Sequence, residues 1–419
     1  MTTPSQNRRS LLTPVIAVQV IVLASLGLAF ALSPREQQKN VQRLVTVSDV
    51  LTTPAPPRTE PLTVEPLYDR PDFVSDDDLA AVLKQVLPKF PRAELKPNFV
   101  EHAVRIWGVQ AEFHDPDVLD GPELRDFLTD HARFAKSWAE TNAKPLLDMR
   151  QAGVAIHYGA DLGASIHHDH WLASLTEAGI ALDAPVFGPG RRNATIADVL
   201  SESLRDFRLD EVETEWTAMA FGLWLPPEQE WTGLGGRKYS FDLLVDRLTR
   251  GQRMHGVCAG THRVYSLMLL VRLDDEFDIL SDGARDVAWD YLEEVRDAIT
   301  AAQLPDGQWP SNWPNGAAAV EDPLEEEEFK QVIATGHHLE WLAIAPQELH
   351  PPDEQIGHAA RWVIDVTLAQ TPEEILERYT FFSHVGNALA LWRGTHPADF
   401  WANRTAEHPA VVQPATEVE

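Results

Sequence analysis

The sequence predicts an all-α protein, an (α/α)6 toroid of six helical hairpins preceded by one N-terminal transmembrane helix. Apolar residues recur at spacings of three and four along most of the chain, as in amphipathic helices, and alternating β-branched runs are few. One long uncharged apolar run lies near the N-terminus, and a block at residues 215–220 returns at residues 340–345. Repeats of this kind are typical of stacked or ring-closed helical hairpins.

The apolar run covers residues 11–32 and follows Arg8 and Arg9, a pair that resembles a twin-arginine export signal. At about 1.5 Å per residue, a helix of this length crosses a hydrocarbon core of about 30 Å. The small-x-small triplet at residues 29–31 suits signal-peptide cleavage, so a cleaved leader is the alternative. The run is longer than the roughly 7–15 residues typical of cleaved segments, which favours an uncleaved anchor. We expect the body to be exported to the periplasmic side.

Polar segments flank this helix and the body. Residues 1–10 are predicted to be a tail, 33–75 a tether that contains Pro54, Pro56 and Pro57, 76–400 the toroid, and 401–419 a C-terminal tail.

The charge and cysteine content exclude several classes of protein. The chain holds 35 Lys and Arg against 64 Asp and Glu, a net charge of −29, and removing Arg8 and Arg9 leaves −31 on residues 33–419. Nucleic acid is therefore not an expected partner, because phosphate contacts need clustered cations. Contact with the membrane is expected only through the N-terminal helix. A single cysteine, Cys258, excludes an intramolecular disulfide and a multi-cysteine zinc knuckle.

Each predicted hairpin pairs an outer helix with an inner one. Residues 284–302 carry one apolar stripe with Ser281 as a cap, as expected for an outer helix, whereas 261–273 are apolar nearly all round, as expected for an enclosed one. The six predicted pairs are 76–89 with 97–109, 121–148 with 165–178, 195–207 with 211–225, 240–250 with 258–273, 284–302 with 332–345, and 354–369 with 376–393. An open solenoid of helix pairs is the competing architecture.

After the fifth outer helix, Gln303, Gly307 and Trp309 form the pattern Gln-x-x-x-Gly-x-Trp. It resembles the glutamine-tryptophan motif of the squalene cyclase and protein prenyltransferase superfamily, and this resemblance implies a six-hairpin α/α toroid. Physically, the glutamine can bond carbonyls at a helix end, the glycine permits a tight turn, and the tryptophan packs beneath it.

The catalytic acid motif of the cyclases is absent from the sequence. The nearest run, residues 274–278 (Asp-Asp-Glu-Phe-Asp), resembles the magnesium site of isoprenoid synthases. In so acidic a chain we expect a solvated loop there, and isoprenoid cyclization is not predicted.

Polar residues recur near the N-terminal halves of the inner helices, whose ends would open onto one central cavity. They are His102, His167, His168, His170, Glu215, His255, Cys258, His262, His337, His338, Glu340 and His384. Taken alone, each histidine is better explained as a hydrogen-bonded helix-end residue.

The segment 255–262 is the most informative part of this set. A helix-start cysteine flanked by histidines suits either a metal site or an activated thiolate, while a small buried cysteine is the structural alternative. For a zinc site we expect Cys258 and His262 with a histidine from another inner helix, with His338 selected over His337 and His384. Related toroids, the protein prenyltransferases and lanthionine cyclases, hold a catalytic zinc with Cys and His inside the toroid. The resemblance implies a metal in the same place, but their ligand motifs do not occur in this sequence.

A second chemistry is suggested by residues 336–341, Gly-His-His-Leu-Glu-Trp, a run similar to segments of sugar epimerases that use an α/α toroid. His337, Glu340 and His255 are the predicted acid–base residues. Glu340 has a counterpart in Glu215, so a structural role for one of them is the alternative.

The predicted function is thus a membrane-tethered, exported toroid enzyme with zinc-assisted or His/Glu chemistry. The alternative is a non-catalytic binding or scaffold toroid. The sequence identifies neither a substrate nor an oligomeric state.

Overall fold

A computed structural model describes residues 9–34, 38, 58–141, 143–250 and 257–407. The chain divides into two units, residues 1–52 and 53–419. In the first unit, α1 (Arg9–Leu32) is a single helix over the predicted anchor. Among the residues that the structure describes, no helix combines the length and the apolar content needed to cross a membrane. The anchor therefore remains a prediction.

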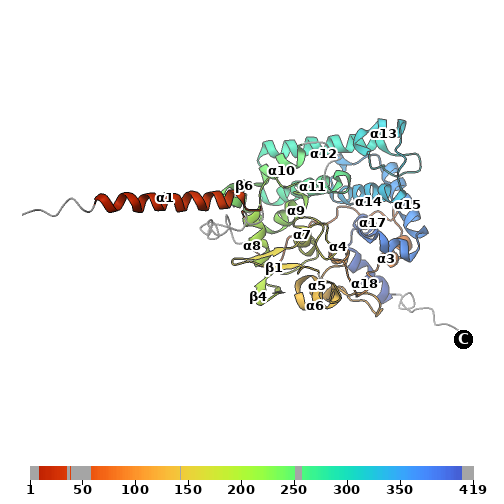
Figure 1. Ribbon diagram of the computed structural model, residues 1–419. Helices are drawn as coiled ribbons and strands as arrows, with labels where there is room; N and C mark the ends of the chain where they lie inside the picture. The colour runs from red at the N-terminus through yellow and green to blue at the C-terminus, as the bar shows by residue number, and fades with distance from the viewer. Residues whose placement is uncertain (1–8, 35–37, 39–57, 142, 251–256, 408–419) are drawn as a thin grey trace, which may run out of the picture. The chain divides into compact units, whose positions relative to one another are not determined.

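The second unit is mostly helical, which confirms the all-α class (Figure 1). Its strands in the described residues form three two-stranded antiparallel sheets: β1 (Leu147–Met149) with β2 (Val154–Ile156), β3 (Pro185–Gly188) with β4 (Arg191–Thr195), and β5 (Glu230–Thr232) with β6 (Lys238–Ser240). These short hairpins lie in connections between helices and build no continuous sheet.

Most helices coincide closely with the predicted pairs. The α-helices described in this unit are α3 (Asp76–Gln85), α4 (Pro97–Trp107), α5 (Gly121–Thr129), α6 (His131–Ser137), α7 (His170–Glu177), α8 (Ile196–Asp206), α9 (Glu215–Trp224), α10 (Phe241–Thr249), α11 (Thr261–Phe277), α12 (Asp282–Ala302), α13 (Ala317–Glu321), α14 (Glu328–Ile344), α15 (Asp353–Ala369), α16 (Pro372–Glu377), α17 (Tyr379–Trp392) and α18 (Pro397–Glu407). Helices α13 and α18 have no predicted counterpart, and α18 extends into the predicted C-terminal tail.

One predicted helix, residues 121–148, is wrong. Asp130 takes an extended conformation and its side chain accepts a hydrogen bond from Ala132 N, so it ends α5 and caps α6. An aspartate that bonds its own downstream backbone competes with helix continuation. The chain beyond α6 then turns into the β1–β2 hairpin.

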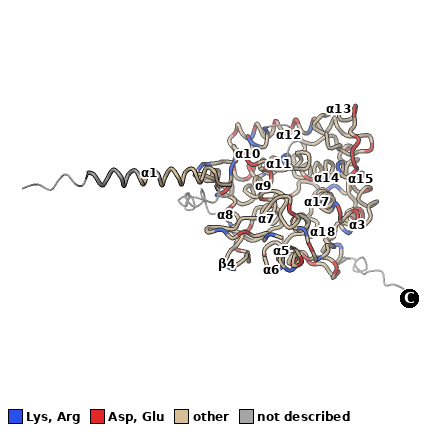
Figure 2. The backbone as a smooth tube through the Cα atoms, viewed as in Figure 1, with Lys and Arg blue, Asp and Glu red and all other residues tan. Residues whose placement is uncertain are grey.

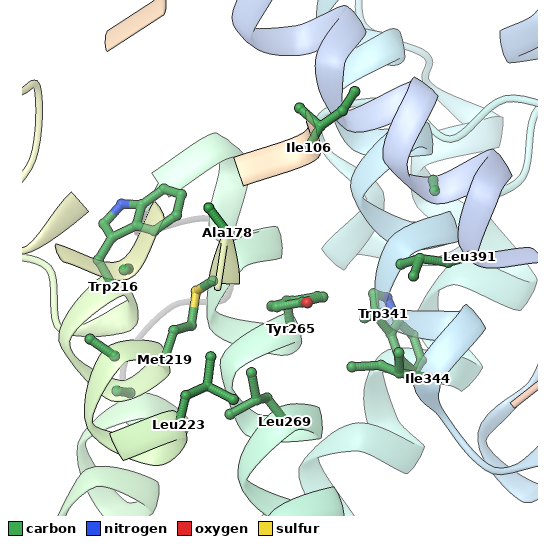
Figure 3. Packing of buried hydrophobic residues seen from close by; sticks show 14 of the residues in the cluster. Ile106, Ala178, Trp216, Met219, Leu223, Tyr265, Leu269, Trp341, Ile344 and Leu391 are labelled. Carbon is green, nitrogen blue, oxygen red and sulfur yellow. The ribbon is translucent and has the colours of Figure 1, made fainter. Parts of the chain in front are cut away.

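The predicted inner helices form a cycle of contacts. Helix α4 contacts α7, α7 contacts α9, α9 contacts α11, α11 contacts α14, α14 contacts α17, and α17 contacts α4. Outside this cycle, α12 packs on α11, α15 on α14, and α3 on α15 and α17. Apolar side chains of α9, α11, α14 and α17 face one another across the interior, with Tyr265 among them (Figure 3).

Burial follows the inner and outer assignment. Helix α11 is buried nearly all round, whereas α12 buries one stripe that includes Ala288, Leu292 and Ile299, and Ser281 caps its first turn. Charged residues are spread mainly over the outer helices and connections (Figure 2). Among the residues whose burial is described, the buried charged ones are Glu101, Arg105, Glu202, Glu215, Arg263, Asp274 and Glu340.

The Gln-x-x-x-Gly-x-Trp segment has the local structure expected of it. Gln303 Nε2 donates to Gly307 O and to Gln355 O, both at 2.7 Å. Gly307 has φ +105° and lies so close to the backbone of His358 that a Cβ would clash. Trp309 is fully buried and donates from Nε1 to Ile299 O at 2.8 Å. The motif therefore fastens the end of α12 to α15.

An extended segment, residues 58–70, lies across the C-terminal ends of the inner helices, and we refer to it as the strap. Its backbone N–H groups donate to carbonyls left free at helix ends: Leu62 N to Leu223 O at 2.9 Å, Leu67 N to Ala343 O at 3.0 Å, and Arg70 N to Trp392 O at 2.8 Å. These residues fall in the range predicted to be a polar tether. The sequence interpretation missed the strap because its alternation of inward-facing and exposed residues is short and is interrupted by prolines.

Candidate functional site

Aromatic rings from all six inner helices form one closed circuit in the interior. Its members, in order, are His102 (α4), His170 (α7), Trp216 (α9), His262 (α11), His337 (α14) and His384 (α17). Successive ring centroids lie 4.7, 4.1, 4.3, 4.6 and 3.8 Å apart. The contact between His384 and His102, with centroids 5.3 Å apart, closes the circuit. All six side chains are buried. The predicted inner helices thus bring their histidines to a common place.

Backbone carbonyls fix the orientation of two of these rings. His102 Nδ1 lies 2.8 Å from Asn98 O, and His337 Nδ1 lies 2.7 Å from Ile333 O. A carbonyl only accepts, so each Nδ1 carries the proton and each Nε2 keeps a lone pair. A ring whose Nδ1 is held in this way presents only Nε2 as an acceptor or metal ligand, which is the arrangement usual for metal-binding histidines.

Cys258, His262 and His337 form a candidate metal-binding group. The Nε2 atoms of His262 and His337 are 3.0 Å apart, and one donor atom from each of the three residues lies within 4.8 Å of the others. A second group of this kind, His337, Glu340 and His384, shares His337. His255, the other predicted residue of this segment, lies outside the described residues.

The geometry of Cys258 does not support an activated thiolate. Cys258 has φ +52° and belongs to a short 3-10 turn, Val257–Gly260, that precedes α11 rather than to the helix start. Burial, together with the charges of Glu340 and Glu213, raises the pKa of the thiol to about 12. In the metal-free protein these features favour the neutral thiol over the thiolate alternative, and binding of a metal would favour loss of the proton.

His338, the predicted third zinc ligand, faces away from this group. Its Nδ1 accepts a hydrogen bond from Trp341 Nε1 at 2.9 Å, and its ring lies edge-on to Trp309 and Trp313 at 5.5 and 4.6 Å. Adjacent residues on a helix point about 100° apart, so His337 and His338 occupy different faces of α14.

Glu340 is held by three polar partners on neighbouring helices. Its Oε1 accepts from Arg105 Nη1 at 3.1 Å and from Asn387 Nδ2 at 2.8 Å, and its Oε2 lies 2.7 Å from His384 Nδ1. The short contact with a carboxylate places the His384 proton on Nδ1. His384 Nε2 is then left without a hydrogen-bond partner among the described residues. Glu340 thus orients His384.

Arg105 links Glu340 to Glu177. Arg105 Nε donates to Glu177 Oε2 at 2.6 Å, and Tyr265 Oη donates to Glu177 Oε1 at 2.8 Å. Burial alone would lower the pKa of Arg105, but the two carboxylates hold it above its ordinary value. The guanidinium therefore stays charged inside the protein.

Burial keeps the histidines of the circuit neutral. It lowers the pKa of His102, His170, His262 and His384 well below the ordinary value, with further lowering by neighbouring imidazoles or Arg105. For His337 burial lowers the pKa to about 4 despite the nearby Glu340. Neutral imidazoles offer lone pairs to a metal at pH 7.

Glu101 lies beside His170, but no hydrogen bond joins the two side chains. Its Oε2 lies 2.6 Å from His170 Nδ1, and both side chains are fully buried. Burial raises the pKa of Glu101 to about 8, so this carboxyl is mostly protonated at pH 7. The pair is electrically neutral, which lowers the cost of its burial.

Two acidic features of the sequence are structural. Glu215 accepts from Thr214 N at 2.8 Å and lies 3.6 Å from Arg263 Nε. Asp274 accepts from Leu280 N at 2.7 Å and pairs with Arg285 at 2.6 Å, so it closes the α11–α12 connection. The solvated loop expected at residues 274–278 is therefore wrong, because residues 274–277 belong to α11 and Asp274 is buried.

His168 and Asp169 lie beside the circuit and predict a pH-dependent stability. Burial alone would lower the pKa of His168, but Asp169, 3.2 Å away, raises it to about 9. The stabilisation is complete below the unfolded pKa of about 6.5 and is lost as the pH rises to about 9, up to about 3 kcal/mol. Urea unfolding at pH 6 and pH 9.5 measures it. His168→Gln should reduce the difference by up to about 3 kcal/mol and leave the part due to Glu101, whose carboxyl has its pKa raised to about 8 and also titrates in this window. An undiminished pH dependence in that variant would assign the titration to other groups.

The sequence interpretation missed Trp216, Arg105, Glu101 and Tyr265. A signal for Arg105 exists, because it is the one charged residue in the otherwise apolar stretch 103–107, Ala-Val-Arg-Ile-Trp. No comparable signal distinguishes Trp216 from the other tryptophans.

Comparisons with known proteins give no family for this chain. No protein-family model, no curated protein and no solved structure matches it.

Proposed function

We propose that the protein is an α/α-toroid metalloenzyme that holds a zinc ion with Cys258, His262 and His337. The observation that carries the proposal is the convergence of three donors of the types zinc prefers, with the His337 lone pair directed at His262. The cyclic contacts of the six inner helices support the toroid.

The two nitrogen donors fit zinc closely. Two Zn–N bonds of about 2.0–2.1 Å at a tetrahedral angle separate the nitrogens by about 3.3 Å, so the 3.0 Å between His262 and His337 needs only a small opening. Three protein ligands leave one position for water or substrate, as in catalytic rather than structural zinc sites. When bound, zinc would supply an acidified water and polarise a substrate.

Other residues of the chain would orient the histidine rings at the site. Ile333 O fixes the His337 ring, and Glu340 fixes the His384 ring beside it. His384 Nε2 has no hydrogen-bond partner among the described residues, and its lone pair can accept a hydrogen bond from a bound molecule. The surrounding neutral imidazoles and Trp216 keep the site apolar enough to strengthen such interactions.

A second candidate function is metal-free acid–base chemistry by His384 and Glu340. The 2.7 Å contact between them has the form of a carboxylate–histidine pair that orients a general base. This candidate, and the rival class of a non-catalytic scaffold, differ from the zinc enzyme in metal content.

Metal analysis of the purified full chain tests the proposal. We expect about one zinc per chain, and a large loss in Cys258→Ser. The matched control is His358→Ala, which removes an exposed histidine distant in sequence from the three ligands and should retain the metal. A chain without zinc, or zinc undiminished in Cys258→Ser, would rule out this site.

We further propose that α1 anchors the chain and that the body works outside the cytoplasm. The apolar sequence of α1 and the export-like arginine pair support this proposal. Two experiments test this proposal. Release of the protein from membranes by alkaline carbonate would exclude an anchor. Protection of residues 53–419 from protease added outside the cell would exclude a body outside the cytoplasm.

A further inference from the structure

The strap covers a small cavity beneath the candidate site. Alternate strap side chains from Leu62 to Arg70 turn toward the body, while those between them are exposed. Leu62 and Val64 line a cavity of about 50 Å3 whose wall includes Arg105, Glu177 and Asn387. One end of the inner-helix cycle is therefore covered by a segment of the chain itself.

A continuous series of contacts leads from this cavity to the candidate ligands. Arg105 Nη1 donates to Glu340 Oε1 at 3.1 Å, Glu340 Oε2 lies 2.7 Å from His384 Nδ1, and the rings of His384 and His337 are 3.8 Å apart. Every side chain in the series is buried. Packed and hydrogen-bonded side chains of this kind transmit a displacement because a filled interior has little free space.

We infer that the strap is a positioning element for the metal centre, acting through Arg105 and Glu340. The inference rests on the proposed zinc site. A seated strap excludes water from Arg105, and this keeps its bonds to Glu177 and Glu340 strong. An unseated strap admits water to the cavity, loosens Arg105 and lets His384 and His337 move, so metal affinity falls. The strap lies C-terminal to the predicted anchor, which makes its seating a link between tether and site.

Two strap variants with opposite side-chain directions test the inference. Leu62→Ala with Val64→Ala removes the two apolar side chains over the cavity, whereas Leu67→Ala truncates an exposed strap side chain and keeps its backbone hydrogen bond. Zinc affinity is measured by chelator competition on the full chain. We expect the double variant to bind zinc about tenfold more weakly and Leu67→Ala to bind as the wild type does.

Hydrogen exchange supplies a readout independent of metal. In the metal-free chain, the double variant should exchange faster at residues 337–341 and 384–386, none of which shares a backbone hydrogen bond with the strap, while the unfolding free energy stays well above zero. Faster exchange only at the strap's own partners near Ala343 and Trp392, with unchanged zinc affinity, would overturn the inference. A wild type that binds no zinc would refute the proposed function, whereas the exchange pattern would still report whether the strap positions these helices.

Discussion

Replacing His337 with glutamine is expected to weaken zinc binding by more than about 100-fold, because it removes a ligand rather than a supporting group, whose loss alone costs about 10–100-fold. His337 Nδ1 is committed to Ile333 O, so only Nε2 remains for the metal, and a glutamine amide does not replace it. Chelator competition on the purified chain measures the change.

The neighbouring residue provides the control for this experiment. His338→Gln alters an equally buried imidazole on the same helix, but one that bonds Trp341 and lies against Trp309 and Trp313. We expect unchanged zinc affinity and a loss of about 1–3 kcal/mol in stability, because a buried bond is disturbed. If His338→Gln lost zinc and His337→Gln retained it fully, the ligands would be Cys258, His262 and His338, the set predicted from the sequence.

Helix positions were predictable from the sequence because they depend on local patterns. The stripe of α12 and the all-round apolar character of α11 are each visible within one stretch of chain, and both agree with the observed burial. The Gln303 turn was predictable for the same reason, since its main partners lie within a few residues. The prediction of one helix over residues 121–148 was wrong because a single side chain, Asp130, bonds the backbone and interrupts the helical pattern.

The choice between His337 and His338 could not be made from the sequence. It depends on the rotation of α14 about its axis, which is set by packing against α11 and α17. A rotation by one residue would exchange their places. The role of Arg105 was hidden for a related reason, because its partners Glu177 and Glu340 are remote in sequence and meet it only when the inner helices assemble.

Replacing Arg105 with methionine is expected to lower the unfolding free energy by about 3–5 kcal/mol, the usual cost of leaving buried carboxylates without their cation. The side chains of Arg105, Glu177 and Glu340 are 5%, 13% and 2% exposed, so water cannot compensate for the loss. Urea unfolding measures the change. The matched control is Arg92→Met, which breaks an ion pair with Glu123 whose side chains are 57% and 43% exposed and should cost less than about 1 kcal/mol.

A double variant separates the two possible reasons for that loss. If unpaired charge is the cause, Arg105→Met combined with Glu340→Gln should recover part of the stability, because one buried charge is removed with its partner. The neutral glutamine no longer holds His384 Nδ1 as a carboxylate does, so zinc affinity should stay low even as stability returns. Recovery of both stability and zinc affinity in the double variant would mean that Arg105 contributes to folding alone. If Arg105→Met were as stable as Arg92→Met, the buried network would not be formed.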